Sequence, residues 1–505
     1  MQPTPTTHRR RRRPRSSLAA FVLALGAGAG AAHGAEAPAV ALPGAHARIG
    51  FERIRFPGNE HVGLVGTSYL VDVGGLPGLA IGPAVYGAIS GRRGGFFTVG
   101  GEVAWRRQLA GPLGVELGLY AGGGGGAGAP QGGGLMLRPH ADLLWDFGPY
   151  ALGLSLSRVR FPNGQIDSTQ VGLVLNAIGN FRHVPARHLG SAVRGGGRAG
   201  AGFDRVQLVT GVYRPRAGTT LNDGSPAPRH IAMLGVRAEQ AFTPSTYWGI
   251  EANGAAESGV ARYTEFLGTV GVESEVVRNR INLGARVALG MAGGGGVRTA
   301  GGSFVKAAVY SVFRLGPDVG LSLEAGLADA PRGDFRAAQV SAALVWALDG
   351  PDSAGAPARA ARTDFSAGLA TFDAPRRDGS TRALRVSVLK IDRYLSPNFY
   401  LSGQVGSAVT GGAGGYASAL LGAGWHQPLG RGFHVGAEVL GGASGGGNVE
   451  SGGRLLQPSA HVGYQLTPGV ALRLGAGRVE GAGGRLSSTL VQGSVVVSYG
   501  LSAGS

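Results

Sequence analysis

Apolar and polar residues alternate along most of the chain, so that every second side chain would share one face. In the segment FTVGGEVAWR, Phe97 and Trp105 fall in one set of alternate positions, and Glu102 and Arg106 fall in the other. The segment LMLRPHADLLW, which begins at Leu135, has the same alternation. A period of two over this length is typical of a β-strand with one apolar and one polar face. The pattern predicts about eight such strands in each of three segments, or about 24 in all.

The three segments carry the same features in the same order, which indicates an internal repeat. Each has an apolar alternation, a glycine run, a second alternation, a tight turn with Pro or Gly and a third alternation; the glycine runs begin near Gly122, Gly293 and Gly441. The repeats are placed at residues 45–180, 200–348 and 362–502, with linkers at 181–199 and 349–361. The resulting spacing suits strands of about 9–11 residues that cross a membrane.

Two kinds of connection alternate between the predicted strands. Tight turns that contain proline include FTPST at 242–246 and LTPG at 466–469, whereas residues 122–134 form a long glycine-rich loop. The glycine-rich loops do not continue into the Gly-Lys-Ser/Thr of a phosphate-binding loop, so we interpret them as flexible. Aromatic residues gather beside the tight turns: Trp105, Trp145, Tyr150, Tyr247, Trp248, Phe313, Tyr394, Phe399, Tyr400, Trp425 and Tyr464. This sorting predicts an interfacial aromatic girdle on one side.

The N-terminus is predicted to be a Sec-type secretory signal peptide over residues 1–35. Arginines at 9–13 form a basic region, an apolar stretch runs from Leu18 to about Ala32, and small residues follow. The rest of the chain has no stretch of 18 or more apolar residues, which predicts no transmembrane helix. An exported chain without a helical anchor is periplasmic, secreted or an outer-membrane barrel.

On these features the chain resembles the Gram-negative outer-membrane β-barrel proteins. The resemblance covers the signal peptide and nearly all of the remaining sequence. It implies an all-β fold, an antiparallel transmembrane β-barrel in the outer membrane of a Gram-negative cell. It also implies contact with outer-membrane lipids and lipopolysaccharide, and insertion by the barrel-assembly machinery. The chain departs from that class at its end, because the last predicted strand, 490–499, ends in Tyr499 and six residues follow it.

The amino-acid composition excludes several classes of site chemistry. The 505 residues include 95 glycines and no cysteine, which excludes disulfides, thiol catalysis and Cys-based metal sites. The net charge of +17 comes almost entirely from arginine; arginines spread over strands and loops predict no nucleic-acid face. His140, His434 and His461 fall at different positions of the repeat with no serine at a fixed spacing. We therefore expect no enzyme activity, no cofactor and no catalytic metal.

Charged residues on the polar strand face are the candidate functional positions. Glu116, Arg286 and Glu438 recur before the glycine runs of the three repeats. The residues expected to face the lumen are Glu102, Arg106, Glu116, Arg138, Glu251, Arg286, Lys306 and Glu438. They would form either a charged pore wall that selects solutes or a buried network of salt bridges inside a closed barrel, and the sequence leaves both open.

The number of barrels decides between these functions. Small inward residues such as Ala80, Gly82 and Ala84 fill a narrow barrel poorly, which favours one wide barrel of about 24 strands. The alternative is three tandem eight-stranded barrels, which the two linkers favour because adjacent strands rarely need such long connections. The predicted function is a passive channel or export conduit with a polar lumen and an unidentified solute. The alternatives are a non-transporting structural or adhesive surface barrel and a soluble β-rich secreted protein.

Overall fold

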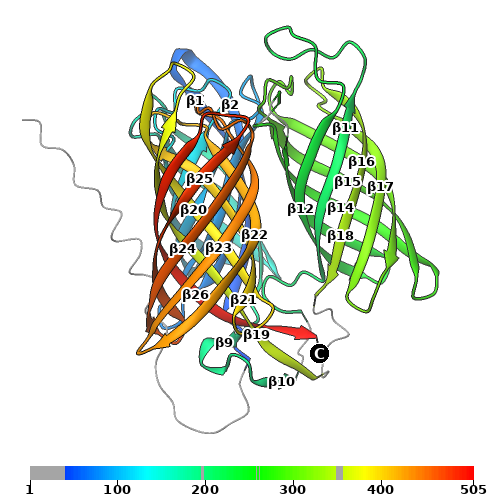
Figure 1. Ribbon diagram of the computed structural model, residues 1–505, viewed down its shortest axis with the longest axis vertical. Coiled ribbons are helices and arrows are strands. Elements are labelled where there is room, and N and C mark those ends of the chain that lie inside the picture. Colours follow the sequence, from blue (N-terminus) through cyan, green and yellow to red (C-terminus); the bar gives the residue numbers. More distant parts are fainter. Residues whose placement is uncertain (1–39, 195–197, 257–258, 261, 349–356, 505) are drawn as a thin grey trace, which may run out of the picture.

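The structure, a computed structural model, describes residues 40–194, 198–256, 259–260, 262–348 and 357–504. The predicted signal peptide lies outside the described residues. Three β-barrels make up the described chain, and Figure 1 shows the second of them, in green, beside the other two. No helix among the described residues is long and apolar enough to cross a membrane.

Each barrel consists of eight consecutive antiparallel strands. Barrel 1 contains β1 (Gly44–Phe56), β2 (Glu60–Asp72), β3 (Leu79–Ser90), β4 (Phe97–Ala110), β5 (Leu113–Gly125), β6 (Met136–Phe147), β7 (Tyr150–Arg160) and β8 (Asp167–Asn180). Barrel 2 contains β11 (Arg205–Pro215), β12 (Ile231–Thr243), β13 (Thr246–Ala255), β14 (Thr264–Val277), β15 (Ile281–Gly293), β16 (Ser303–Arg314), β17 (Val319–Asp329) and β18 (Arg336–Ala347). Barrel 3 contains β19 (Pro357–Pro375), β20 (Thr381–Tyr394), β21 (Phe399–Thr410), β22 (Ala417–Gly430), β23 (Phe433–Gly445), β24 (Arg454–Thr467), β25 (Val470–Ala482) and β26 (Ser487–Gly504).

The favoured expectation of one wide barrel is wrong, because each repeat closes on itself. The first strand of each repeat pairs with the eighth strand of the same repeat, β1 with β8, β11 with β18 and β19 with β26. The small inward residues do not widen the barrels; they make room for large side chains. The Tyr86 ring of β3 covers Gly66 of β2, and a Cβ on Gly66 would lie only 2.1 Å from that ring. Ala84, two residues before Tyr86 on β3, is buried beside it. Alternation of small and large inward residues is how a small barrel fills its interior.

The two strand faces differ as the alternation predicted. Along β7, Leu152, Leu154 and Leu156 point outward and are more than half exposed, whereas Ser155 and Ser157 point inward and are buried. The same division holds around all three barrels. Each barrel therefore has a largely apolar outer wall and a polar middle, which is the arrangement expected of a strand that meets lipid on one side.

Apolar side chains nevertheless close one end of each barrel interior, which the sequence did not predict. We call this the loop end, since the glycine-rich loops lie there, and the opposite end the turn end. In barrel 1, Phe96 packs between Phe56 and Phe161 with ring centroids 5.7 and 5.9 Å away. In barrel 2 the rings of Phe304 and Phe335 stack at 6.2 Å. Among the described residues, a core of buried apolar side chains therefore closes the interior of each barrel at the loop end.

The aromatic girdle at the turn end is only partly as expected. Trp145, Tyr150 and Phe399 point outward and are exposed, in keeping with an interfacial position. Tyr394 and Tyr400, which the sequence assigned to the same girdle, are buried inside barrel 3. Their position beside the turns was predicted, but their face of the strand was not.

The barrels touch through loops that the sequence indicated to be merely flexible. The loop between β3 and β4 of barrel 1 donates the Gly94 amide to the Ala300 carbonyl of barrel 2, at 2.8 Å. The loop between β21 and β22 of barrel 3 donates the Gly415 amide to Gly124 of barrel 1, at 3.1 Å. In both cases the loop after the third strand of one barrel contacts the end of the fifth strand, or the loop after it, of another.

The same contact recurs a third time and closes a ring. Arg262, in the loop after the third strand of barrel 2, lies against Gly445 at the end of the fifth strand of barrel 3; a Cβ there would be 2.4 Å from its Cγ. Each barrel thus offers one loop to one neighbour and receives a loop from the other. Head-to-tail contacts of this kind form a closed ring when three rotations complete a circle.

The first linker packs onto barrel 3, although it joins barrels 1 and 2. Its short strands β9 (Val184–Pro185) and β10 (Ala192–Arg194) pair with β26 and β19, on either side of the helical turn η3 (Ala186–His188). The last strand does not end at Tyr499 as predicted. It continues to Gly504 against β19, and the Tyr499 ring packs on the linker's His183 at 4.6 Å.

Candidate functional site

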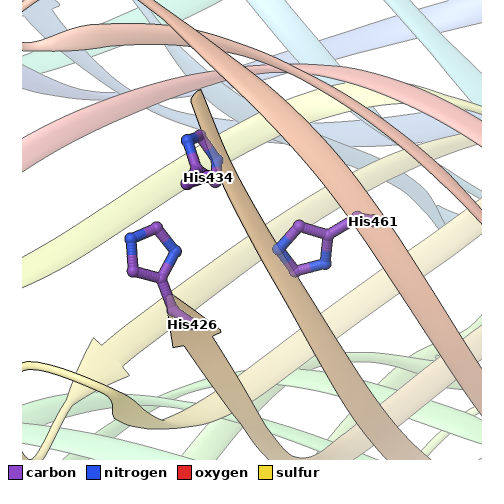
Figure 2. A group of neighbouring side chains, drawn as sticks. All are labelled: His426, His434 and His461. Atoms are coloured by element: carbon purple, nitrogen blue, oxygen red, sulfur yellow. The ribbon is translucent and has the colours of Figure 1, made fainter. Parts of the chain in front are cut away.

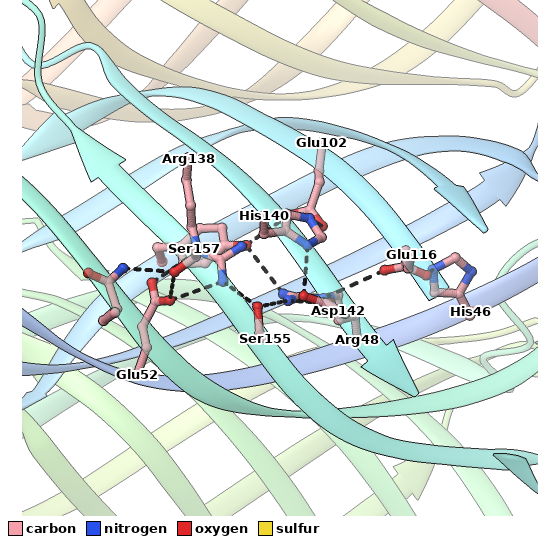
Figure 3. Close-up of polar contacts among 12 residues, drawn as sticks. His46, Arg48, Glu52, Glu102, Glu116, Arg138, His140, Asp142, Ser155 and Ser157 are labelled. Carbon is pink, nitrogen blue, oxygen red and sulfur yellow. Dashed lines mark hydrogen bonds and ion pairs between the residues drawn. The ribbon is translucent and has the colours of Figure 1, made fainter. Parts of the chain in front are cut away.

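The interior of barrel 1 holds two guanidinium groups and several carboxylates in one continuous network (Figure 3). Nη2 of Arg48 lies 2.9 Å from Oδ2 of Asp142, and its Nε lies 3.8 Å from Glu116. Arg138 donates to both carboxylate oxygens of Glu52, at 3.0 Å each. All five side chains are nearly inaccessible to solvent. The guanidiniums are therefore engaged by protein groups and do not form an open, hydrated wall.

Histidines link the carboxylates of this network. Nδ1 of His140 lies 3.0 Å from Asp142, and its Nε2 lies 3.4 Å from Glu102. Nε2 of His46 lies 3.3 Å from Glu116. Each of these imidazoles in barrel 1 thus has at least one carboxylate partner. A His–Asp pair can orient a catalytic base, but the second nitrogen of His140 faces a carboxylate and no nucleophile.

Barrel 2 contains a comparable network with more cations. Nε of Arg237 lies 2.7 Å from Glu251, and its Nη2 lies 3.4 Å from Glu324. Arg286 also pairs with Glu324, and Lys306 pairs with Glu251. Each carboxylate is therefore shared by two cations. Removal of one partner from such a buried pair leaves an uncompensated charge, which costs about 3–5 kcal/mol.

Barrel 3 also centres on shared carboxylates. Asp392 lies 3.0 Å from Arg473 and 3.1 Å from Lys390, and Lys390 also pairs with Glu438. The Tyr400 hydroxyl donates to Glu438 at 3.0 Å. Among the described residues, ion pairs thus fill the middle section of each barrel interior.

Barrel 3 adds a group that the other two interiors do not contain among their described residues, a cluster of three histidines (Figure 2). His426 on β22, His434 on β23 and His461 on β24 are all buried, and one ring nitrogen of each lies within 4.8 Å of the others. The ring centroids of His426 and His434 are 4.8 Å apart, and those of His434 and His461 are 6.3 Å apart. We call these three residues the histidine cluster.

The register of three adjacent strands brings the histidine cluster together. Gly436 on β23 is opposite His426 on one side and His461 on the other. Because Gly436 has no side chain, the space between the two imidazoles stays open; a Cβ there would lie 2.5 Å from Nε2 of His461. His434 is two residues along β23 and points into the same interior.

Four of the six ring nitrogens of the histidine cluster lack hydrogen-bond partners. Nδ1 of His426, Nε2 of His434 and both nitrogens of His461 are buried without one. The other nitrogen of His426 lies 3.3 Å from Nη1 of Arg362. An unsatisfied buried polar group costs about 1–3 kcal/mol. Three such groups at one point call for a ligand or another specific explanation.

The structure distributes the eight predicted lumen residues over three interiors. Seven are buried inside a barrel: Glu102, Glu116 and Arg138 in barrel 1, Glu251, Arg286 and Lys306 in barrel 2, and Glu438 in barrel 3. The eighth, Arg106, is partly exposed near the turn end of barrel 1, where it pairs with Asp146 at 2.5 Å. Glu116, Arg286 and Glu438 lie on the fifth strands of their barrels, but no common wall brings them together.

Sequence reasoning missed His426 and the association of the histidine cluster. Comparison between repeats does not relate His434 to His461, because they occupy different positions of the repeat. A signal was present, since His426 and His434 lie on either side of a tight turn on one hairpin and share its polar face. Pairing across the hairpin, in place of comparison between repeats, would have found them.

A second candidate site is the space between the barrels. A cavity of about 3860 Å³ is lined by outward side chains of all three, including Phe97 and Leu119 of barrel 1, Ile250 and Phe266 of barrel 2, and Leu401 of barrel 3. The linker arginines Arg182, Arg187 and Arg198 line it near the turn end. Ordinary small-molecule pockets measure about 300–1,000 Å³. This cavity is several times larger and mostly apolar.

Comparisons with known proteins find no family. No family model matches the chain, and no curated protein matches it. Among solved structures, OccK2 of Pseudomonas aeruginosa is 10% identical over 91% of this chain and 98% of its own, with a TM-score of 0.21. The ferric enterobactin receptor PfeA of the same species is 11% identical over 91% and 80%, with a TM-score of 0.28. The siderophore receptor PirA of Acinetobacter baumannii is 10% identical over 90% and 80%, with a TM-score of 0.27. Such low scores transfer no property of those proteins to this chain.

The class of protein follows from the fold itself. The described strands close into antiparallel barrels of even strand number, with an apolar outer wall, short turns at one end and longer loops at the other. These are the defining features of Gram-negative outer-membrane β-barrels. The chain resembles that class in its fold, and its outer walls suit the lipid of an outer membrane.

Proposed function

We propose that this chain is a non-enzymatic outer-membrane protein that holds phospholipid between its three barrels and conducts no solute through the barrels themselves. The observation that carries the proposal is the cavity of about 3860 Å³ between the barrels. Ile250 and Leu401, which line it, leave 51% and 44% of their surfaces uncovered by protein. In a membrane, acyl chains would cover these surfaces, because exposed apolar area is favourable only against an apolar medium.

The ends of the cavity support a phospholipid as the occupant. At the loop end, amide contacts such as Gly94 to Ala300 join the barrels and limit access from that side. At the turn end the linker contributes Arg182, Arg187 and Arg198 to the lining; Arg187 is exposed, and Arg198 is paired with Asp204 at 2.6 Å. Arginine near a membrane surface attracts anionic headgroups by about 1 kcal/mol per residue. Phospholipid whose acyl chains enter from the turn end would place its phosphate there.

Lipid retention tests this proposal. Outward-facing Gly268 and Gly403 line the cavity, and a Cβ at either position would meet no atom closer than 3.5 Å. The double variant Gly268→Trp with Gly403→Trp should fill part of the cavity and reduce the phospholipid that remains after detergent exchange, as counted by native mass spectrometry. Gly441→Trp is the matched control, because Gly441 has a similarly open outward position but does not line the cavity. Equal lipid retention in the three proteins, or none in any of them, would reject the proposal.

The passive channel predicted from the sequence is the second candidate, and the polar middle of each barrel favours it. The apolar plugs at the loop end and the paired carboxylates oppose it. Planar bilayers that contain the refolded protein should therefore show no steady conductance. A steady conductance whose selectivity shifts toward anions when Glu116 and Glu438 are replaced by Gln would establish a channel and reject the closed barrels.

A further inference from the structure

We propose that the histidine cluster of barrel 3 is a binding site for a divalent transition-metal ion of the zinc type. Three imidazoles from three adjacent strands converge on the space left open by Gly436. Each offers a nitrogen with no hydrogen-bond partner in the described structure, and all three residues are at least 95% buried. Three histidines plus one open position form a known zinc coordination set, and imidazole also suits copper and nickel.

The geometry needs only a modest contraction. The three ligand nitrogens lie within 4.8 Å of one another. Zn–N bonds of 2.0–2.1 Å in a tetrahedron place ligand nitrogens about 3.3 Å apart. A bound ion would therefore draw the rings together by about 1.5 Å at most. The Arg362 contact at His426 can be given up, because Arg362 keeps two hydrogen bonds to Asp364, at 2.8 Å each.

The electrostatic surroundings permit a cation. Arg362, Lys390 and Arg473 are the nearby cations, and each is paired with a carboxylate of Asp364, Asp392 or Glu438. The three cations and three carboxylates thus sum to zero formal charge, although Arg473 and Lys390 act on His461 more strongly than any carboxylate does. Among the described residues, the three imidazoles of the cluster make no ion pair with a carboxylate, which distinguishes them from His46 and His140 in barrel 1.

The cluster lies on the turn-end side of the apolar plug of barrel 3. His426 and His434 flank the tight turn between β22 and β23, so the cluster lies close to the turn end of barrel 3. The apolar plug of barrel 3, around Phe372 and Tyr416, is at the other end. An ion that enters from the turn end would therefore not have to cross that plug.

Titration of the full chain with Co²⁺ and Zn²⁺, after chelator treatment in detergent, tests the site. We expect one Co²⁺ per chain with the visible absorption of a four-coordinate ion, displaced by Zn²⁺. His434→Gln and His461→Gln should each weaken binding by about tenfold or more. His61→Gln on the exposed surface of barrel 1 is the control and should leave it unchanged. No saturable binding, or binding that survives replacement of all three cluster histidines, would overturn the proposal.

A second measurement uses intact histidines, in case a variant fails to fold. Trp425 is adjacent to His426 on β22, and Trp145 lies in barrel 1. In single-tryptophan proteins, Cu²⁺ at the site should quench Trp425 fluorescence saturably at one ion per chain, and should leave Trp145 much less affected. Equal quenching of the two tryptophans, or no saturable quenching of Trp425, would also overturn the proposal.

Discussion

Barrels 1 and 3 are built alike but use histidine in opposite ways. In barrel 1, His140 is held between Asp142 and Glu102 at 3.0 and 3.4 Å. In barrel 3, His434 and His461 lie beside each other, and the carboxylates near them are committed to arginine and lysine. The same residue type in the same kind of interior therefore pairs with carboxylates in barrel 1 and, among the described residues, makes no ion pair with a carboxylate in the cluster of barrel 3. Chemistry is set by the neighbours across the strand, not by the fold.

The largest expected difference between barrels 1 and 3 is the stability lost when a buried polar side chain on the sixth strand is replaced, because this side chain forms an ion pair only in barrel 1. Arg138→Met in barrel 1 should lower the free energy of unfolding by about 3–5 kcal/mol, because Glu52 would stay buried without its guanidinium. Gln457 of barrel 3, also on a sixth strand, makes one amide contact at 3.4 Å, and Gln457→Met should cost about 1 kcal/mol. Urea unfolding in lipid vesicles, followed by Trp145 for barrel 1 and Trp425 for barrel 3, measures both. A cost below about 1 kcal/mol for Arg138→Met would mean that water fills the interior.

The second largest difference between barrels 1 and 3 should be in the stability that each gains when metal is added. At a Zn²⁺ concentration one hundred times Kd, barrel 3 should gain about 2.7 kcal/mol against unfolding, and barrel 1 should gain nothing. The same tryptophan signals report the two transitions, and a chelator should reverse the gain. A shift of both transitions together would show nonspecific binding and would remove the contrast between the two histidine environments.

Without metal, replacement of a histidine should destabilise barrel 1 more than barrel 3. His140→Gln disrupts contacts with two carboxylates and should destabilise barrel 1 by about 2 kcal/mol, since hydrogen bonds to charged groups contribute about 1.5–3. His434→Gln removes an imidazole whose Nε2 has no partner and should change barrel 3 by less than about 1 kcal/mol. Chelator-treated protein in the urea assay gives both values. A larger loss from His434→Gln would indicate a structural role that its contacts do not explain.

The smallest energetic effect should come from the contact between barrels 1 and 3. A Cβ on Gly123 of β5 would lie 2.5 Å from the Ser407 carbonyl of β21, so Gly123→Val should push the barrels apart with little loss within either. Gly179→Val is the control, because a Cβ there meets nothing within 4 Å. Spin labels on cysteines at the exposed turn positions Pro149 and Pro397 report the spacing in a chain with no native cysteine. An unchanged distance distribution in Gly123→Val would mean that this contact does not hold the barrels together.

Strands, faces and connection types were predictable because they depend on neighbours in sequence. The alternation of Leu152, Leu154 and Leu156 with buried serines needs only the period of two. The two linkers also pointed to separate barrels. Barrel number could not be settled from local pattern, since closure depends on whether the eighth strand reaches the first strand of its own repeat.

The site was predictable only in part, for a similar physical reason. Glu116 and Arg138 were placed on the polar face, but their partners come from strands far away in sequence, as Arg48 and Glu52 do. The apolar plug around Phe96 was missed because those residues interrupt the polar face near the loop end. The glycine-rich loops were interpreted as flexible because a close approach between backbones leaves no sequence pattern beyond glycine itself.

The ring of three barrels on one chain has a consequence for stoichiometry. If the three barrels were identical separate subunits, they would have to associate in solution or in the membrane, and every site would occur three times. Covalent linkage makes all three contacts intramolecular, so closure does not depend on protein concentration. It also lets the copies diverge, and the histidine cluster occurs in barrel 3 alone among the described interiors. Any ion held there would bind once per molecule, with a simple hyperbolic titration and no cooperativity between equivalent sites.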